Sequence, residues 1–190
     1  MSDPQRSTVQ YPGGLAGRYR WGGTAAAADI FALSESGGEL TDHGHLVSKQ
    51  PDTLCRAELR IEGPLGVWTA RFASPIFDEP EGLLWDTEAL LVIKYGFFAY
   101  ALAGRSGDLR WWHESGTPLV AVLGSPRLDH VIIQSEVETF AIDGTGTTVW
   151  RVAHSDVITA AELMGGTLAL TSYGGDVAAL DPDSGRTLSH

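Results

Sequence analysis

Two short groups of side chains have the residue types of a metal site. His43 and His45 stand two positions apart and could chelate an ion from an extended loop. A zinc site takes about four ligands, and no further ligand is identifiable by spacing. Asp181, Asp183 and Gly185 match the start of a calcium loop, but the later acidic ligand is missing. We therefore expect a solvated loop at the first group, a turn at the second, and no bound metal.

Three further groups have the residue types of phosphate binding or nucleophilic catalysis. Residues 144–148 are rich in Gly and Thr, but they lack the Lys of a phosphate-binding loop and precede a strand. Residues 154–156 read His-Ser-Asp, yet sequence neighbours point in different directions, and the chain has no G-x-S-x-G elbow. Cys55 is the single cysteine, and such a residue is usually a small buried hydrophobe. The sequence therefore predicts no catalytic residue.

The second half of the chain contains a sequence repeat, which predicts the strands and turns that position most of these residues. One sequence motif, here called the phrase, spans Ala101 to Trp111 and recurs from Ala141 to Trp150 and from Ala179 to Ser189. The repeat alanines are 40 and 38 residues apart, a period typical of β-propeller blades. Before each copy lie short apolar runs separated by turns. Counting the strand that ends each phrase, every unit has about four strands, which is one blade.

Each position of the phrase has a physical role. The shared positions are Ala101, Ala141 and Ala179, Asp143 and Asp181, Gly107, Gly146 and Gly185, and Trp111 and Trp150. An Asp can accept hydrogen bonds from a turn backbone. A Gly takes the left-handed conformation at low cost. A Trp buries about 150–250 Å² of surface, so we expect it between neighbouring blades.

This spacing resembles the tryptophan-docking repeat of quinoprotein-type (PQQ-like) β-propellers over residues 83–189. The first copy has Ala103 where Asp is usual, the second copy is one residue shorter, and the third ends in Ser189 instead of Trp. In the quinoprotein dehydrogenases, PQQ lies at the centre of an eight-bladed ring, between a Trp and a vicinal disulfide. With one cysteine and room for half such a ring, this chain is not expected to bind PQQ. The resemblance implies instead a scaffold whose rim holds another protein.

The predicted fold is all-β, a propeller-like array of four-stranded antiparallel blades, about four to five in number. A closed ring, an open fan and completion by a second chain all remain open, and an open end favours self-association because it exposes strand edges. Residues 34–54 are expected to be an exposed loop. The expected parts are a flexible segment at 1–24, an irregular β region at 25–82, and three repeats at 83–112, 118–152 and 157–189, together spanning 83–189.

Composition narrows the classes of partner. The formal net charge is −11, with 43% hydrophobic and 19% charged residues. An acidic globular protein does not favour nucleic acid or an anionic membrane as its partner, since both attract basic surfaces. The N-terminus lacks the basic and apolar runs of a signal peptide, and no apolar stretch is long enough to span a membrane. We therefore expect a protein of the bacterial cytoplasm.

Two features could form a contact surface. Strand alternation places Trp111 and Trp112 on opposite faces, so Trp112, with His113 beside it, is a candidate partner contact. The acidic segment 78–81 is the other. The function that follows is a non-enzymatic binding or scaffold protein. Two alternatives remain open, a small acidic inhibitor or immunity-type protein, and an enzyme with a site in the central channel.

Overall fold

The structure is a computed structural model that describes residues 4–24, 39–42, 53–85 and 89–188. In these residues the chain forms strands joined by turns, with a short 3-10 helix, η1 (Pro12–Gly14), between the first two strands. The strands make four sheets, named A to D in chain order. The all-β, propeller-type class predicted from the sequence is confirmed.

Sheet A has the strand order β1-β2-β4-β5-β3, with β3 parallel to β5 and every other pair antiparallel. Its strands are β1 (Gln5–Tyr11), β2 (Leu15–Gly22), β3 (Glu39–Asp42), β4 (Cys55–Gly63) and β5 (Gly66–Ser74). Sheet B contains β6 (Glu81–Trp85), β7 (Leu90–Tyr95), β8 (Phe98–Ala103) and β9 (Leu109–Glu114). Sheet C contains β10 (Leu119–Leu123), β11 (His130–Ser135), β12 (Glu138–Asp143) and β13 (Thr148–Ala153). Sheet D contains β14 (Ile158–Met164), β15 (Thr167–Ser172) and β16 (Val177–Leu180).

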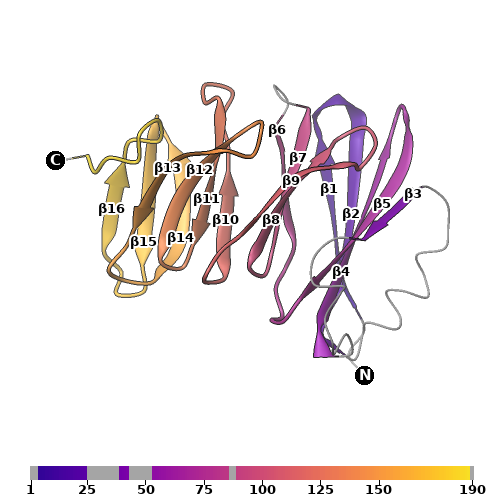
Figure 1. The fold of residues 1–190 in the computed structure, drawn as a ribbon, viewed down its shortest axis with the longest axis horizontal. Coiled ribbons are helices and arrows are strands. Elements are labelled where there is room, and N and C mark those ends of the chain that lie inside the picture. Colours follow the sequence, from indigo (N-terminus) through magenta and orange to yellow (C-terminus); the bar gives the residue numbers. More distant parts are fainter. Residues whose placement is uncertain (1–3, 25–38, 43–52, 86–88, 189–190) are drawn as a thin grey trace.

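The sheets stack face to face in chain order along the long axis of the molecule (Figure 1). Each junction is an apolar cluster contributed by two neighbouring sheets. Strands β7 and β8 are buried along their whole length because sheet B has a neighbour on each face, which explains their continuous apolar sequences. Sheets A and D lie at opposite ends, so within the described residues the row does not close into a ring.

The N-terminal region departs from the expectation of a flexible segment and an exposed loop. Tyr11, Tyr19 and Trp21 are buried in the cluster between sheets A and B, and the hydroxyls of the two tyrosines lie 2.6 Å apart. This burial holds β1 and β2 in sheet A despite their glycines and polar residues. Residues 39–42, expected in a loop, form β3 because the edge of β5 offers backbone groups that need partners. His43 and His45 lie outside the described residues, as do residues 25–33.

The third repeat forms three strands where the sequence predicted four. After β16 there is an isolated bridge between Leu180 and Thr187. In sheet B the pair at this position, Leu102 with Leu109, begins the fourth strand. Sheet D therefore has three strands and a single bridge at the place where the fourth strand begins in its neighbour.

The outward face of sheet D differs from the matching faces of sheets B and C. The paired residues beside the repeat alanine in sheets B and C are Leu83 with Val92, and Leu123 with Ile132. In sheet D the residues at this position are Glu162 and Ala169, beside Ala179. Large apolar side chains thus give way to a carboxylate and a methyl group.

Candidate functional site

The repeat tryptophans lie at the junctions between neighbouring sheets. Trp111 on β9 packs against Gly146 in the turn of sheet C, where an added Cβ would be 2.7 Å from the Trp side chain. Trp150 on β13 packs against Gly185 in the turn of sheet D, with a corresponding distance of 2.5 Å. Both glycines have left-handed φ values, +90° and +70°. Each turn thus receives the indole of the preceding sheet, and no side chain could replace its glycine without displacing that indole.

The alanines of the repeat make room for these rings. Ala101 pairs directly with Trp111, and Ala141 pairs with Trp150. Both alanines are fully buried. Ala179 occupies the same position on β16, where it is half-buried. A larger residue at the first two positions would compete with the indole for the space between two sheets.

Sheet A docks in the same way, although the residues just before Trp68 do not match the phrase. Trp68 on β5 is 3% exposed and lies against Gly107 in the turn of sheet B, where a Cβ would be 2.6 Å from the ring. Its Nε1 donates a hydrogen bond to the carbonyl of Gly104, at 3.0 Å. Trp150 likewise donates to the carbonyl of Pro182, at 3.1 Å. The sequence analysis does not identify Trp68. The signal for it is the turn glycine Gly107, because each such glycine packs against a tryptophan of the preceding sheet.

The shorter second phrase has a structural consequence. In sheet B the turn closes with a bond from Gly107 N to Ala103 O, four residues apart, whereas in sheet C it closes from Gly146 N to Asp143 O, three residues apart. In this tighter turn, no described carbonyl oxygen accepts a hydrogen bond from the indole of Trp111. The Nε1 of Trp111 is buried and has no hydrogen-bond partner among the described residues. One of the three docked indoles is therefore left without the bond that the other two make.

The aspartate of the phrase braces two of the three turns. Asp143 accepts hydrogen bonds from the Thr145 hydroxyl at 2.6 Å and from the backbone N of Thr147 at 3.0 Å, and these bonds lower the pKa of Asp143. Asp181 accepts from the Ser184 hydroxyl at 2.6 Å and from the backbone N of Asp183 at 3.1 Å, with the same effect on its pKa. These bonds account for the aspartates as turn residues.

Trp112, next to the docked Trp111, faces the other way. Trp111 is 7% exposed and Trp112 is 54% exposed. The ring of Trp112 lies 5.9 Å from that of Phe98, which is buried on β8. The indole of Trp112 thus presents a large aromatic surface to solvent. The neighbouring Trp111 is buried in a junction, and the ring of Phe98 supports the buried side of the Trp112 indole.

His113 lies on the opposite face of β9, against sheet C. Its ring is 4.9 Å from that of Phe140, and Nη2 of Arg151 is 3.2 Å from its Nε2. Burial, followed by the charge of Arg151, lowers the pKa of His113. The imidazole is consequently neutral near pH 7 and forms part of the junction, so only Trp112 of the two candidate contacts offers a broad exposed surface.

The acidic segment 78–81 is partly used inside the protein. Both carboxylate oxygens of Asp78 accept from Nζ of the buried Lys94, at 3.1 and 3.2 Å, and one also accepts from the backbone N of Gly96. Burial raises the pKa of Glu81, an effect that the Lys94 charge opposes. These contacts tie the segment between sheets A and B to sheet B, so Asp78 is not a free acidic group.

The remaining residues with reactive side chains make structural contacts. Cys55 is buried, and this burial raises the pKa of its thiol. His154 is 2.6 Å through Nε2 from the Thr139 hydroxyl, and partial burial lowers its pKa. Within the described ranges, no group of three or more His, Cys, Asp or Glu side chains is placed to hold a metal ion. Nor does any helix there have the length and apolar character needed to cross a membrane.

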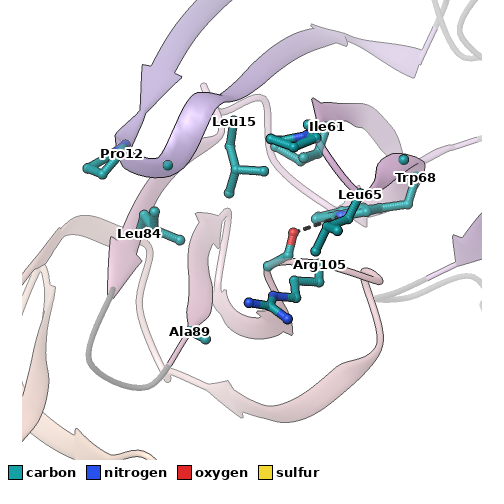
Figure 2. Close-up of a pocket in the computed structure, with 13 residues that line it drawn as sticks. Pro12, Leu15, Ile61, Leu65, Trp68, Leu84, Ala89 and Arg105 are labelled. Atoms are coloured by element: carbon teal, nitrogen blue, oxygen red, sulfur yellow. Dashed lines mark hydrogen bonds between the residues drawn. The ribbon is translucent and has the colours of Figure 1, made fainter.

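A cavity of about 310 Å³ opens at the junction of sheets A and B (Figure 2). Apolar side chains line most of it, including Leu15, Ile61 and Leu84. The Trp68 ring forms one wall, next to its bond to Gly104, and Arg105 lies at the side of the cavity near Ala89 (Figure 2). The cavity lies beside the docked indole, where the turn of sheet B approaches sheet A.

No protein-family model matches the sequence, and no curated protein matches it. Among solved structures, dihydro-heme d1 dehydrogenase NirN in complex with DHE has a TM-score of 0.57 and 11% identity over 96% of this chain and 42% of its own. The computationally designed Ika8 protein has a TM-score of 0.51 and 12% identity over 72% of this chain and 45% of its own.

BamB from Moraxella catarrhalis has a TM-score of 0.45 and 16% identity over 60% of this chain and 37% of its own. The chain thus spans less than half the length of each of these structures. At such low identities, the likeness to NirN and Ika8 shows the fold alone: a set of stacked blades of propeller type.

Proposed function

We propose that the protein is a non-enzymatic binding module, built as a quinoprotein-type propeller scaffold, that holds a partner protein at the outer rim of sheet B. The exposed indole of Trp112 is the observation that carries this proposal. Tryptophan is enriched among residues that dominate protein–protein binding energies. Its strand is fixed because Trp111 is locked into the next junction, so little conformational entropy is lost on binding.

Charge indicates the kind of partner. Residues 75–190 contain 16 of the 24 acidic residues but only six of the 13 basic ones. Glu114, two residues beyond Trp112, is exposed, and Glu136 and Asp156 lie at the same ends of sheets C and D. A carboxylate two residues from an exposed aromatic ring favours a basic partner at that end of β9, since charge steers the encounter and cations bind to ring faces.

The test is capture of binding partners from the native host with the wild-type protein and two variants. Trp112→Ala removes the proposed anchor, and Tyr173→Ala removes an aromatic ring that is 82% exposed on sheet D. We expect a partner that binds the wild type and Tyr173→Ala but is weakened about thirtyfold by Trp112→Ala, the effect of a hot spot of about 2 kcal/mol. Equal capture by all three proteins would contradict the proposal.

A further inference from the structure

The structure contains an example of strand addition to the outer edge of a blade. In sheet A, β3 pairs in parallel with β5, and its register places Glu39 beside Trp68 and Asp42 beside Arg71. The added strand therefore starts at the docked tryptophan and runs along the four residues from Trp68 to Arg71. A strand edge gains main-chain hydrogen bonds from such an addition, whatever the sequence of the added segment.

Sheet B presents the same edge without an added strand. Trp111 occupies the position of Trp68, because each packs on the turn glycine of the following sheet. The stretch Trp111–Glu114 on β9 thus corresponds to the stretch on β5 that β3 covers. In the part of the chain that the structure describes, β9 pairs with β8 alone and is the last strand of its sheet.

The side chains of β9 specify what an added strand should carry. Trp112 pairs with Tyr100 and Glu114 pairs with Phe98, so the indole and the carboxylate point to the same face of the sheet. Glu114 also contributes to the raised pKa of Tyr100, after burial, which places its charge near that ring. A residue beside Trp112 would meet an apolar surface, and the residue two positions later would meet a negative charge.

The middle position of the added strand has a different neighbour. His113 points to the face that packs on sheet C, where the guanidinium of Arg151 lies beside it. A basic residue at this middle position would approach Arg151. The pattern that fits β9 is therefore an apolar residue, then a residue without positive charge, then Lys or Arg.

We propose that the outer edge of β9 binds an extended segment of a partner protein as a parallel fifth strand, in the register that β3 takes on β5. This inference rests on the proposed function and specifies its binding mode. The segment places an apolar side chain against Trp112 and a basic one against Glu114, and its backbone pairs with β9. Sheet B thereby becomes five-stranded, as sheet A already is.

Sheet C supplies a matched control. Its outer strand β13 is also the last of its sheet, and Trp150 is docked like Trp111. The residues that correspond to Trp112 and Glu114 are Arg151 and Ala153. This edge thus has the same backbone geometry but lacks both the aromatic anchor and the carboxylate.

The experiment uses the full chain, isotope-labelled for NMR, and a short acetylated and amidated peptide of Thr and Val with Leu and Lys two positions apart. We expect amide shifts concentrated at Trp111–Glu114 and small ones at 150–153. Methylating the peptide's backbone nitrogens on the edge-facing side removes hydrogen bonds but keeps the side chains, and it should weaken binding about tenfold. Replacing the peptide's Lys with Glu should weaken its binding to the wild-type protein. Glu114→Lys in the protein should restore binding of that Glu-containing peptide.

Several outcomes would overturn the proposal. Shifts at β13 equal to those at β9, binding that survives backbone methylation, or no binding of the unmethylated peptide would each exclude this mode. Val149→Ala, an exposed position on β13, should leave the affinity unchanged. A partner whose capture depends on Trp112 although the peptide does not bind would leave the proposed function standing and remove only the strand-addition mode.

Discussion

Sheet A and the repeat sheets B to D reach the same junction geometry from different sequences. In sheets B and C, turn and tryptophan occur together in one phrase, and both are visible in the sequence. Sheet A has Trp68 but no such turn among its described residues, and sheet D has the turn at Gly185 but no Trp at the matching position. All three junctions nevertheless pair an indole from one sheet with a glycine from the next.

The difference shows that the phrase is not one functional unit. Its turn serves the junction with the preceding sheet, and its tryptophan serves the junction with the following sheet. Within the described stack, sheet A contributes only a tryptophan to a junction, and sheet D contributes only a turn. The partial phrases of sheets A and D are therefore sufficient for the three junctions among the described sheets.

The largest expected effect tests whether sheet A is joined like the others. Trp68→Ala should reduce the free energy of unfolding by about 3–5 kcal/mol, because it removes a buried indole and leaves a cavity. Trp111→Ala should cost a similar amount. Chemical denaturation measures both, with Trp112→Ala as the control, since that exposed ring should contribute within about 0.5 kcal/mol. A Trp68→Ala effect as small as the control would show that the first junction is held differently.

A smaller effect separates the contact with the indole from the backbone conformation of the glycine. Gly107→Ala places a methyl group against Trp68 at a φ of +77°. Gly175→Ala imposes a similar backbone cost at a φ of +89°, but no atom lies within 4 Å of the new Cβ. We expect a loss of about 1–2 kcal/mol for Gly175→Ala and about 1–3 kcal/mol more for Gly107→Ala. Equal losses in thermal unfolding would mean that the turn does not receive the ring tightly.

The smallest effect distinguishes the two kinds of turn. A benzothiophene analogue of tryptophan, introduced at one site by codon reassignment, removes the ring N–H while keeping its shape. At Trp68 it should cost about 1 kcal/mol, because the bond to Gly104 is lost. At Trp111 it should be neutral or stabilising, because that N–H is buried without a described partner. Denaturation midpoints compare the two, and a loss at Trp111 equal to that at Trp68 would contradict the account of the shortened turn.

The sequence predicts the parts of this fold that depend on local chemistry. Gly146 and Gly185 are recognisable because a left-handed turn nearly requires glycine. The opposite orientations of Trp111 and Trp112 follow from strand alternation. Trp68 could not be assigned in the same way, since its partner Gly107 is 39 residues away. The sequence also could not reveal β3, because parallel addition to an edge depends on a strand that exists only after the sheet has formed.

The candidate contact residues show the same distinction between local pattern and tertiary packing. From the sequence, Trp112 and His113 are both candidate contacts because both follow a docked indole. Strand alternation places His113 on the face of Trp111, but only the packing of sheet C against β9 identifies Phe140 as its neighbour and leaves Trp112 in solvent. Likewise, the composition of segment 78–81 indicates an acidic surface, but the buried amine of Lys94 neutralises Asp78. Such pairings join residues far apart in the chain and are not encoded by any short pattern.

The carboxylate at Glu162 restricts what can cover the outward side of sheet D. The equivalent sides of the two preceding sheets accept a neighbour rich in aliphatic groups, which interdigitates with Leu83 or Ile132. Against Glu162 such a neighbour would have to dehydrate an anion without compensation, at a cost of several kcal/mol in real proteins. Only a surface that supplies a cation, or one that leaves water in place, is compatible with this end of the stack.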